Sequence, residues 1–577
     1  MEREELVQVA TAWMAEDPDP VTRAATLLML EEGDEARLAA CFGGRLEFGT
    51  AGLRGPIGPG PLGMNRALVR RVTAGLGHYL LAHAPDAQAR GVAIGFDGRH
   101  GSMDFAEDAA CVLGGLGIRT YLYDAVTPTP QLANAVVALG AAAGIMVTAS
   151  HNPPADNGYK VYWDNGAQII PPHDAGISEA VDAMTSLTGV SVPAIEKLRA
   201  IGLVNEVPVE VLAAYLDAVH ALRVHSGGPL RVVYTAMHGV GAQLIEAALT
   251  RAGYTDVYMV PEQRDPDPDF PTVAFPNPEE PGALDLAMAL ARDVAADLIL
   301  ANDPDADRLA VAVPDGRGGF RQLTGNQVGC LLAEDLLTHG EQSGGRLVST
   351  TIVSSTLLQA IAKAHGADFV ECLTGFKWIA NQAIAYDAGP GRFVMGYEEA
   401  LGYSVGPVAR DKDGISAALL LCDLAAFERA RDRNLLDALA SLGERYGVYG
   451  SGQKSLVMPG TEGAARIQAI LAALRADPPR SFAGVDVVRV QDVWTGEERD
   501  LITGERSAVA LPKSNVLVWH LADGSRVLAR PSGTEPKVKF YFEVREAMAG
   551  GLAATEAAAN ERIAALRDDV MARLNAM

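Results

Sequence analysis

Short apolar runs alternate with longer amphipathic segments along most of the chain. Residues 91–96 form an apolar run, residues 103–116 have a helical pattern, and residues 118–123 form a second apolar run. An apolar run that ends in turn-forming residues is typical of a buried strand, and strands that alternate with helices favour a largely parallel sheet. The apolar run 144–147, followed by Thr148-Ala149-Ser150-His151-Asn152-Pro153, is predicted to be a further strand with a loop at its end.

The same plan recurs farther along the chain. Residues 230–235 and 297–301 are predicted strands of a second unit, and residues 346–352, 368–371 and 392–395 are predicted strands of a third. From about residue 450 the alternation loosens and polar strands become more frequent, which indicates a smaller α+β domain. The predicted fold class is therefore α/β, with three similar α/β mixed-sheet domains and a smaller C-terminal α+β domain. The predicted domains span residues 1–210, 211–324, 325–448 and 449–577.

Size and charge narrow the classes of function. A chain of 577 residues is too long for one hydrophobic core. Its net charge of −24 disfavours binding to nucleic acid or to an anionic membrane, so neither partner is expected. The five cysteines show no metal-ligand spacing, and the N-terminus shows no signal peptide. We expect a cytoplasmic protein with reduced thiols that is a monomer or a small homo-oligomer.

Ser150 is the first candidate for chemistry. It lies in a loop at the carboxyl end of a predicted strand, where open α/β sheets bind their ligands. His151 is expected to point away from it, because neighbours on an extended chain face opposite sides, and no G-x-S-x-G elbow surrounds the serine. A hydrolase triad is therefore not favoured. Lys160 lies ten residues beyond Ser150 across a hairpin-like turn, from which it could return to the serine.

Three carboxylates follow the predicted strand 297–301, at Asp303, Asp305 and Asp307. Carboxylates this close repel one another unless a cation neutralises them or water screens them. An EF-hand needs glycine at loop position six and glutamate at position twelve, where this chain has Arg308 and Pro314. A solvated acidic loop is the alternative, but the preceding apolar strand favours a metal site. Mg²⁺ is favoured over Ca²⁺, because three ligands leave positions for a phosphate.

Other stretches carry groups that bind phosphates or sugars. The run Arg530-Pro531-Ser532-Gly533-Thr534-Glu535-Pro536-Lys537 combines a guanidinium, two hydroxyls and an amine, and it is either a phosphate site or an exposed turn. Glu398 and Glu399 are either solvated or hydrogen-bonded to vicinal sugar hydroxyls. Arg54, in a glycine-rich turn, is either solvated or an anion contact. Polar and cationic groups at further loop positions are Thr374, Lys377, Arg410 and Lys412.

Four of these stretches resemble, in the same order, the hallmark loops of the α-D-phosphohexomutase superfamily. The serine loop T-A-S-H-N-P, the metal loop D-x-D-x-D-R, the sugar loop G-E-E/x and the phosphate loop R-x-S-G-T-E-P match residues 148–153, 303–308, 396–402 and 530–536. The resemblance covers essentially the whole chain. Residues 275–280 and 374–378 look most like the branch that holds bacterial α-phosphoglucomutases and animal phosphopentomutase-type enzymes.

The resemblance implies four domains around a central cleft and a phosphosugar mutase activity. Ser150 would carry a phosphoryl group, and the substrate would be a phosphosugar that becomes bisphosphorylated and turns over during the reaction. Mg²⁺ would be the cofactor, and glucose 1,6-bisphosphate would act as activator and intermediate. The implied metal ligands are Ser150, Asp303, Asp305 and Asp307. The implied catalytic residues are Ser150, Lys160, His151, Arg54 and Arg308. The implied substrate-binding residues are Thr374, Gly375, Lys377, Glu398, Glu399, Lys412, Arg530, Ser532, Gly533, Thr534 and Lys537.

The resemblance leaves the sugar open. Many hexose enzymes read G-E-x-S-G in the sugar loop, whereas this chain has Ala400 after the two glutamates. We expect interconversion of α-D-glucose 1-phosphate and glucose 6-phosphate. The alternatives are a phosphopentomutase, a phosphomannomutase and, more distantly, a sugar phosphatase or a noncatalytic sugar-phosphate sensor. Either Lys160 or His151 could assist proton transfer.

Overall fold

The computed structural model describes residues 1–49, 52–458, 460–531 and 537–576, without the side chains of residues 460 and 461. The described chain divides into two compact units. The first consists of Met1–Leu347 and Phe376–Arg431, and the second of Val348–Gly375 and Asp432–Met577. Among the described residues, no helix has both the length and the apolar character needed to cross a membrane. The fold class is α/β with mixed sheets, as the sequence predicts.

The first sheet has the strand order β1-β5-β4-β2-β3-β6. Strand β2 pairs in parallel with β3 and β4, whereas β5 pairs antiparallel with β4. Val92 and Ile94 of β2 belong to one apolar core and Ala93 to another, so both faces of the strand are covered. The strands are β1 (Leu53–Pro56), β2 (Val92–Phe96), β3 (Thr120–Leu122), β4 (Ala143–Val147), β5 (Asp156–Trp163) and β6 (Val204–Glu206).

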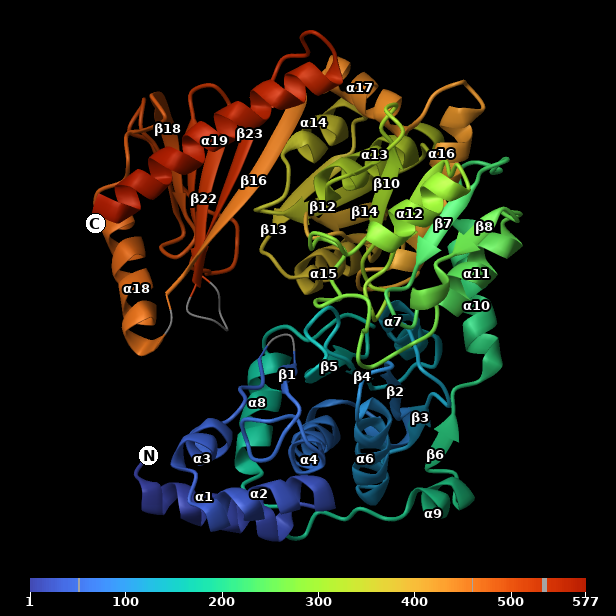
Figure 1. Ribbon diagram of the computed structural model, residues 1–577, viewed down its shortest axis with the longest axis vertical. Coiled ribbons are helices and arrows are strands. Elements are labelled where there is room, and N and C mark those ends of the chain that lie inside the picture. The colour runs from blue at the N-terminus through green and yellow to red at the C-terminus, as the bar shows by residue number, and fades with distance from the viewer. Residues whose placement is uncertain (50–51, 459, 532–536, 577) are drawn as a thin grey trace. The chain divides into compact units, whose positions relative to one another are not determined.

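Helices cover this sheet on two sides. α6 and α7 both contact β2 and β4, and α4 packs side by side with α6 (Figure 1). The alanine-rich N-terminal segment forms three short helices, which bury a stripe that includes Trp13. The helices are α1 (Arg3–Glu16), α2 (Pro20–Glu32), α3 (Glu35–Phe42), α4 (Arg66–His83), α5 (Ala87–Arg90), α6 (Ser102–Gly115), α7 (Thr129–Ala138), α8 (His173–Ala183), α9 (Ile195–Ala200) and α10 (Val209–Ala221).

The second sheet has the order β11-β10-β9-β7-β8. Strand β7 is parallel to β8 and β9, and β10 is antiparallel to β9 and β11. The loop after β9 therefore leaves the sheet at the carboxyl edge of its parallel strands. The elements are β7 (Val232–Thr235), α11 (Ala242–Arg251), β8 (Val257–Met259), the 3₁₀ helix η1 (Pro261–Gln263), α12 (Asp285–Asp293), β9 (Leu298–Ala301), β10 (Ala310–Pro314) and β11 (Phe320–Gln322).

A third sheet consists of four strands, of which β14 and β15 form an antiparallel hairpin. Helix α13 packs on β14 and begins with a capping box at Thr324 and Gln327. The elements are α13 (Gly325–His339), β12 (Arg346–Thr351), α14 (Leu357–Ala364), β13 (Asp368–Cys372), α15 (Phe376–Asp387), β14 (Arg392–Glu398), β15 (Gly402–Val405) and α16 (Gly414–Arg429).

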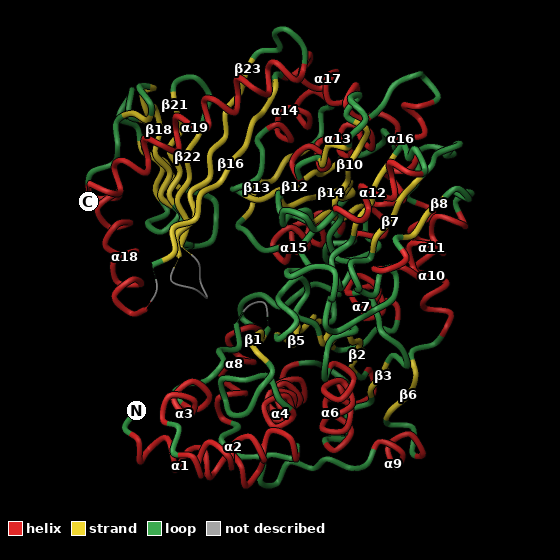
Figure 2. The backbone as a smooth tube through the Cα atoms, viewed as in Figure 1, coloured by secondary structure: helices red, strands yellow, loops and turns green. Residues whose placement is uncertain are grey.

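The C-terminal sheet differs from the first two because the strand pairings among its described residues are antiparallel. Helix α19 lies across β16 and β23 (Figure 2), and the predicted apolar stripe Ile563, Leu566, Val570 and Leu574 is buried there. The elements are α17 (Leu435–Tyr446), β16 (Val448–Val457), α18 (Gly460–Ala476), β17 (Ser481–Phe482), β18 (Val485–Asp492), β19 (Glu497–Asp500), β20 (Arg506–Ala508), β21 (Leu517–Leu521), β22 (Arg526–Pro531), β23 (Lys537–Glu546) and α19 (Leu552–Ala576).

Candidate active site

The serine loop leaves β4 at Val147 and is held by a buried arginine. Arg99, 4% exposed, donates hydrogen bonds to the carbonyl oxygens of Ser150 and Asn152 at 2.6 Å each. It donates two more to the carbonyl oxygens of Pro153 and Asp156, at 2.7 and 3.1 Å. One guanidinium therefore fixes the path of the whole loop, which compensates for the left-handed backbone of Ser150 at a φ of 53°.

The left-handed backbone at Ser150 also corrects the expected direction of His151. The Ser150 hydroxyl lies 3.2 Å from Nδ1 of His151, although neighbours on an extended strand would point apart. The expectation was wrong because Ser150 is not extended. Burial holds the pKa of His151 well below its ordinary value, and the Arg308 and Arg54 cations lower it further. His151 is thus a neutral imidazole beside the serine.

The aspartate loop leaves β9 and meets the serine loop. Asp303, Asp305 and Asp307 are at most 1% exposed, and one ligand atom from each lies within 4.8 Å of the others. The Ser150 hydroxyl donates a hydrogen bond to Oδ2 of Asp303 at 2.8 Å. Ala306, at the centre of the loop, has a φ of 57°, so this loop also has a left-handed residue. The predicted serine and aspartate loops therefore form one buried site.

Two lysines neutralise the aspartates. Lys160 Nζ lies 2.7 Å from Oδ2 of Asp305 and 3.1 Å from Oδ2 of Asp307. Lys412 Nζ lies 3.1 Å from the same oxygen of Asp307. Burial raises the pKa of Asp305, but Lys160 more than offsets this effect, so the pKa lies below its ordinary value. Asp303 differs, because burial together with the charges of Asp305 and Asp307 raises its pKa well above the ordinary value.

The carboxylates have unfilled coordinating capacity that suits a hard cation. Oδ1 of Asp305 and Oδ1 of Asp307 are buried and accept no hydrogen bond from any described residue. A buried carboxylate oxygen without a partner is costly, and a divalent ion with oxygen ligands satisfies it. The donor set, three carboxylates beside a serine hydroxyl, fits Mg²⁺ as the sequence predicts.

The sugar loop adjoins the aspartate loop. The amide of Leu309 donates to the carbonyl oxygen of Leu401 at 2.9 Å, and Arg308 and Gly402 form an isolated antiparallel bridge. A Cβ on Gly402 would lie 2.3 Å from Cδ of Lys412, so glycine at this position allows the lysine to pass. Glu398 ends β14, and its charge, after those of Asp307 and Asp411, helps to raise the pKa of Lys412 against the effect of burial.

Three further predicted residues of the first unit lie on separate elements. Arg54 lies in β1 opposite Gly158 of β5, close enough to His151 to lower its pKa. Lys377 lies in the first turn of α15, and burial lowers its pKa to about 8. Glu399 follows β14 in the turn that leads to β15.

Several predicted residues belong to the second unit. Thr374 and Gly375 follow β13, Arg530 lies in β22 opposite Lys539, and Lys537 begins β23. Ser532, Gly533 and Thr534 lie outside the described residues. Within this unit, Arg526 donates to the carbonyl oxygen of Ile352 at 3.0 Å and to Oε1 of Glu543 at 3.1 Å. The segment 348–375 and the C-terminal sheet are thus joined through buried charges.

Sequence reasoning missed two residues that support the site. Thr129, at the start of α7, donates from Oγ1 to Oδ2 of Asp305 at 2.6 Å and from its amide to the Asp305 carbonyl oxygen at 2.9 Å. Arg99, described above, is the other. Both follow strands of the first sheet at the edge that carries Ser150, and this position was the available signal.

Sequence comparison matches four segments of the chain to one family. Residues 45–188, 213–318 and 324–446 match phosphoglucomutase/phosphomannomutase alpha/beta/alpha domains I, II and III, in that order. Residues 464–571 match the C-terminal domain of the same family. Together these matches cover well over half of the chain and run in the order of the sheets described above.

Individual relatives have different names. The chain is 40% identical over 84% of its length to a Haemophilus influenzae protein named "Probable phosphomannomutase", of which it covers 93%. It is 37% identical to the human phosphopentomutase, with 93% of this chain and 91% of the relative covered. It is also 37% identical to a Staphylococcus epidermidis phosphoglucomutase, with 86% and 90% covered. Relatives of similar identity are named for different sugars, so identity alone does not decide which sugar this chain uses.

Proposed function

Because the chain belongs to the phosphoglucomutase/phosphomannomutase family and is a phosphosugar mutase, an isomerase that moves a phosphoryl group within a sugar, we propose that it interconverts α-D-glucose 1-phosphate and glucose 6-phosphate. The observation that carries the proposal is the position of the Ser150 hydroxyl, 2.8 Å from Asp303 and 3.2 Å from the neutral His151. A buried hydroxyl between a neutral imidazole and a cation-binding aspartate loop suits a group that takes up and returns a phosphoryl group.

In the proposed reaction Ser150 begins as phosphoserine. The bond between phosphorus and Ser150 Oγ breaks as a bond to the free sugar hydroxyl oxygen forms. The proton of that hydroxyl replaces the phosphoryl group on the Ser150 oxygen, and the sugar becomes a bisphosphate. The sugar then turns over, so that its other phosphoryl group returns to Ser150 and the isomeric monophosphate leaves. Glucose 1,6-bisphosphate is therefore both intermediate and activator, because it can phosphorylate Ser150 of an enzyme that has lost the group.

The side chains around Ser150 have separate roles in this proposal. His151 lies within hydrogen-bond reach of the Ser150 oxygen and has a pKa well below its ordinary value through burial, so it is placed to hold a proton there only briefly. Lys160 pairs with two carboxylates, which against the effect of burial raise its pKa, so it stays a cation and positions them. Arg54 and Arg308 add positive charge beside the serine.

Asp303, Asp305 and Asp307, with an oxygen at Ser150, would hold Mg²⁺. The ion, when bound, supplies positive charge that offsets the charge of the phosphoryl oxygens during transfer. The buried oxygens of Asp305 and Asp307 that accept no hydrogen bond from the described residues support this assignment.

Binding of the sugar and of its distant phosphate is assigned to loops of the third and fourth domains. We infer that Glu398 and Glu399 accept hydrogen bonds from sugar hydroxyls and that Lys412 adds a cation beside them. The proposed ligands of the distant phosphate are Arg530, Ser532, Gly533 and Thr534, and the further proposed substrate-binding residues are Thr374, Gly375, Lys377 and Lys537. The same groups would bind either phosphate as the sugar turns over.

The alternative substrates are ribose or deoxyribose 1-phosphate and mannose 1-phosphate. Ala400 supports the pentose alternative, because it replaces a hydroxyl that many hexose enzymes have at this position. A comparison of rates separates the candidates: the full chain is supplied with Mg²⁺, a catalytic amount of glucose 1,6-bisphosphate, and glucose, mannose or ribose 1-phosphate in turn. We expect the highest kcat/KM with glucose 1-phosphate.

The same assay distinguishes a mutase from other activities. Dominant turnover of ribose 1-phosphate would overturn the glucose assignment and keep the mutase chemistry. Release of inorganic phosphate without an isomeric product would instead favour a sugar phosphatase. Ser150→Ala protein is the matched blank, because it lacks only the proposed phosphoryl carrier.

A further inference from the structure

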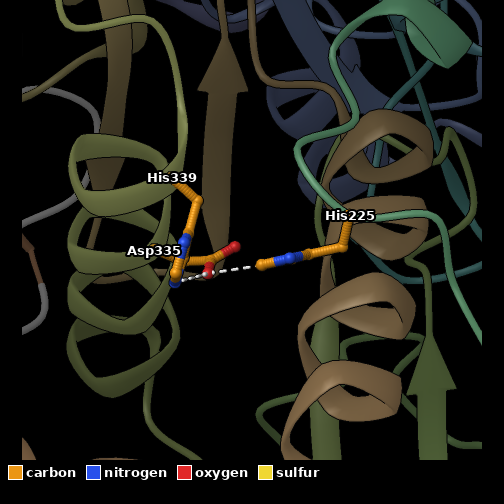
Figure 3. A group of neighbouring side chains, drawn as sticks. All are labelled: His225, Asp335 and His339. Atoms are coloured by element: carbon orange, nitrogen blue, oxygen red, sulfur yellow. Dashed lines mark hydrogen bonds and ion pairs between the residues drawn. The ribbon is translucent and has the colours of Figure 1, made fainter.

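A second group of potential metal ligands lies outside the site described above. His225 follows α10, and Asp335 and His339 lie one turn apart on α13 (Figure 3). Residues i and i+4 share one face of a helix, so the spacing of Asp335 and His339 places both side chains toward His225. Figure 3 shows His225 approaching Asp335 from the opposite side, with His339 next to the same carboxylate.

The three side chains converge on one point. Nε2 of His225 lies 2.8 Å from Oδ1 of Asp335, and Nε2 of His339 lies 3.9 Å from the same oxygen. One ligand atom from each residue lies within 4.8 Å of the other two. Two bonds of the usual length for Zn²⁺, at a tetrahedral angle, place ligand atoms about 3.3 Å apart. The two observed separations bracket this value, so small side-chain movements would complete a three-ligand site.

We propose that His225, Asp335 and His339 bind a borderline divalent transition metal ion, with Zn²⁺ as the preferred metal. Imidazole nitrogens suit Zn²⁺, whereas Mg²⁺ prefers a set of oxygens such as the aspartate loop. Three protein ligands leave the fourth position of a tetrahedral ion for water. The site is therefore chemically distinct from the one at Ser150.

Burial and neighbouring charge suit the proposed ion. The side chains of His225 and Asp335 are 9% and 5% exposed, whereas that of His339 is 35% exposed, which leaves an entry path from solvent. His225 also lines a cavity of about 660 Å³ between residues 224–229 and the end of α16. Two arginines near this end of α16 have carboxylate partners, since Arg429 pairs with Asp297 and Arg431 lies 3.8 Å from Glu428. Their charge is thus partly neutralised.

The ring of Phe427 holds His225 in the orientation that the site requires. The two rings are stacked, with centroids 4.1 Å apart and planes at 18°, and His339 meets Phe427 edge-on at 4.9 Å. An apolar shell of this kind limits the freedom of metal-ligating rings. A bound ion would join the segment after α10 to α13, so the expected role is to stabilise this part of the first unit.

The test is a calorimetric titration of the full chain with Zn²⁺, in excess Mg²⁺ so that the aspartate loop is occupied. We expect one equivalent to bind to the wild-type protein. His339→Gln and Asp335→Asn should weaken binding by more than about tenfold, the loss that even outer-shell partners of metal ligands cause. His339→Gln is the more secure variant, because its side chain is exposed and its loss leaves the His225–Asp335 hydrogen bond in place.

Two controls make the outcome specific. His78→Gln changes an exposed histidine of α4 that is not part of the cluster, and Asp305→Asn changes the other candidate metal site. Both should keep the Zn²⁺ affinity of the wild type. Co²⁺ offers an independent readout, since four-coordinate Co²⁺ absorbs visible light far more strongly than the octahedral ion, and His339→Gln should remove that absorption.

Three outcomes would overturn the proposal. These are no Zn²⁺ binding by the wild-type protein, equal binding by the wild type and His339→Gln, and loss of binding in Asp305→Asn alone. The last would place the ion at the aspartate loop. Because the readout is binding and not turnover, failure here would leave the proposed mutase activity untouched.

Discussion

The aspartate loop and the histidine cluster, which consists of His225, Asp335 and His339, each bring three potential metal ligands together. The two groups differ in how their buried charge is neutralised. The aspartate loop places three carboxylates at no more than 1% exposure and surrounds them with Lys160 and Lys412. The histidine cluster has one carboxylate, Asp335, and obtains its other ligand atoms from two rings that carry no fixed charge. Removing an ionised group from water is costly, so the first arrangement depends on protein cations and the second does not.

The type of ligand therefore determines both which ion a site prefers and whether neighbouring side chains must supply countercharge. A set of carboxylates selects a hard ion and requires countercharges whenever the ion leaves. A set with two imidazoles selects a softer ion and can remain as a hydrogen-bonded group without it. A change in either region leaves the other as a control.

Ser150→Ala should have the largest effect. Loss of the proposed phosphoryl carrier should lower kcat by more than about a thousandfold, as loss of a catalytic nucleophile does in other enzymes. The fold should survive, because a single hydrogen bond to Asp303 is worth only about 1 kcal/mol. The measurement is the rate of glucose 6-phosphate formation, with circular dichroism as the check on folding. Full activity would end the phosphoserine proposal.

Asp305→Asn and Asp335→Asn make a matched pair. Asp305→Asn should lower activity by about 100-fold or more, since changes even to outer-shell groups of metal sites cost 10- to 100-fold, and it should shift the Mg²⁺ dependence of the rate. Asp335→Asn should leave kcat and KM near those of the wild type, because the histidine cluster is not part of the proposed active site. An unchanged Mg²⁺ dependence in Asp305→Asn would count against the aspartate loop as the metal site.

Lys160→Met should destabilise the protein most when Mg²⁺ is removed. Lys160 contacts both Asp305 and Asp307, and loss of one partner of a buried ion pair costs about 3–5 kcal/mol. Added Mg²⁺ should recover part of that loss, because the ion supplies countercharge. Urea unfolding in chelator and in Mg²⁺ measures both values, and Lys197→Met, at an exposed position of α9, is the control. Equal losses in the two buffers would show that the lysine does not substitute for the ion.

His520 contrasts with the buried aspartates, because its buried ring has no opposite charge or hydrogen-bond partner at Nε2 among the described residues. Its substitution should have the smallest effect of the changes proposed. Its Nε2 is buried and has no hydrogen-bond partner among the described residues, and burial, with Arg489 and Arg526, lowers its pKa to about 3. The unfolded chain takes up a proton below the ordinary pKa of about 6.5, whereas the folded chain does not. Stability is therefore fully present above that pH and falls as pH decreases toward 3.

Between pH 6.5 and pH 5 the expected loss from His520 is about 2 kcal/mol. Urea unfolding at neutral pH and at pH 5 measures it, and His520→Gln should show a smaller difference between the two conditions. His78→Gln, which changes an exposed histidine, should keep the wild-type difference. If His520→Gln loses as much stability on acidification as the wild type, His520 is not the group responsible.

Sequence patterns were sufficient to predict the candidate residues that lie directly after a strand. Ser150 and Asp303 each follow a short apolar run, and the shared geometry of α/β sheets places such loops at one edge. The strands and helices around them were predictable for the same reason, because a buried strand must be apolar along its whole length. Repetition of that pattern predicts three parts of the chain, and its loosening from about residue 450 predicts the fourth.

Patterns could not predict contacts between distant segments or the exact backbone. Lys412 contacts Asp307 because whole elements pack together. The same holds for His225 and Asp335, two residues that are 110 positions apart in the sequence. The Asp335 and His339 spacing on a helix was a visible signal, but two ligands do not specify a third. The direction of His151 was predicted wrongly because the left-handed conformation of Ser150 has no sequence signature in a non-glycine residue.

The grip of Arg99 on the serine loop has a consequence for the order in which the protein matures. The arginine follows β2 and its four carbonyl acceptors follow β4, so they meet only when these parallel strands have paired. Ser150 therefore acquires its final geometry only when the sheet has assembled. An unfolded or damaged chain has the same serine but not its setting, so in the proposed reaction Ser150 would be phosphorylated only in a chain whose first and second sheets have assembled.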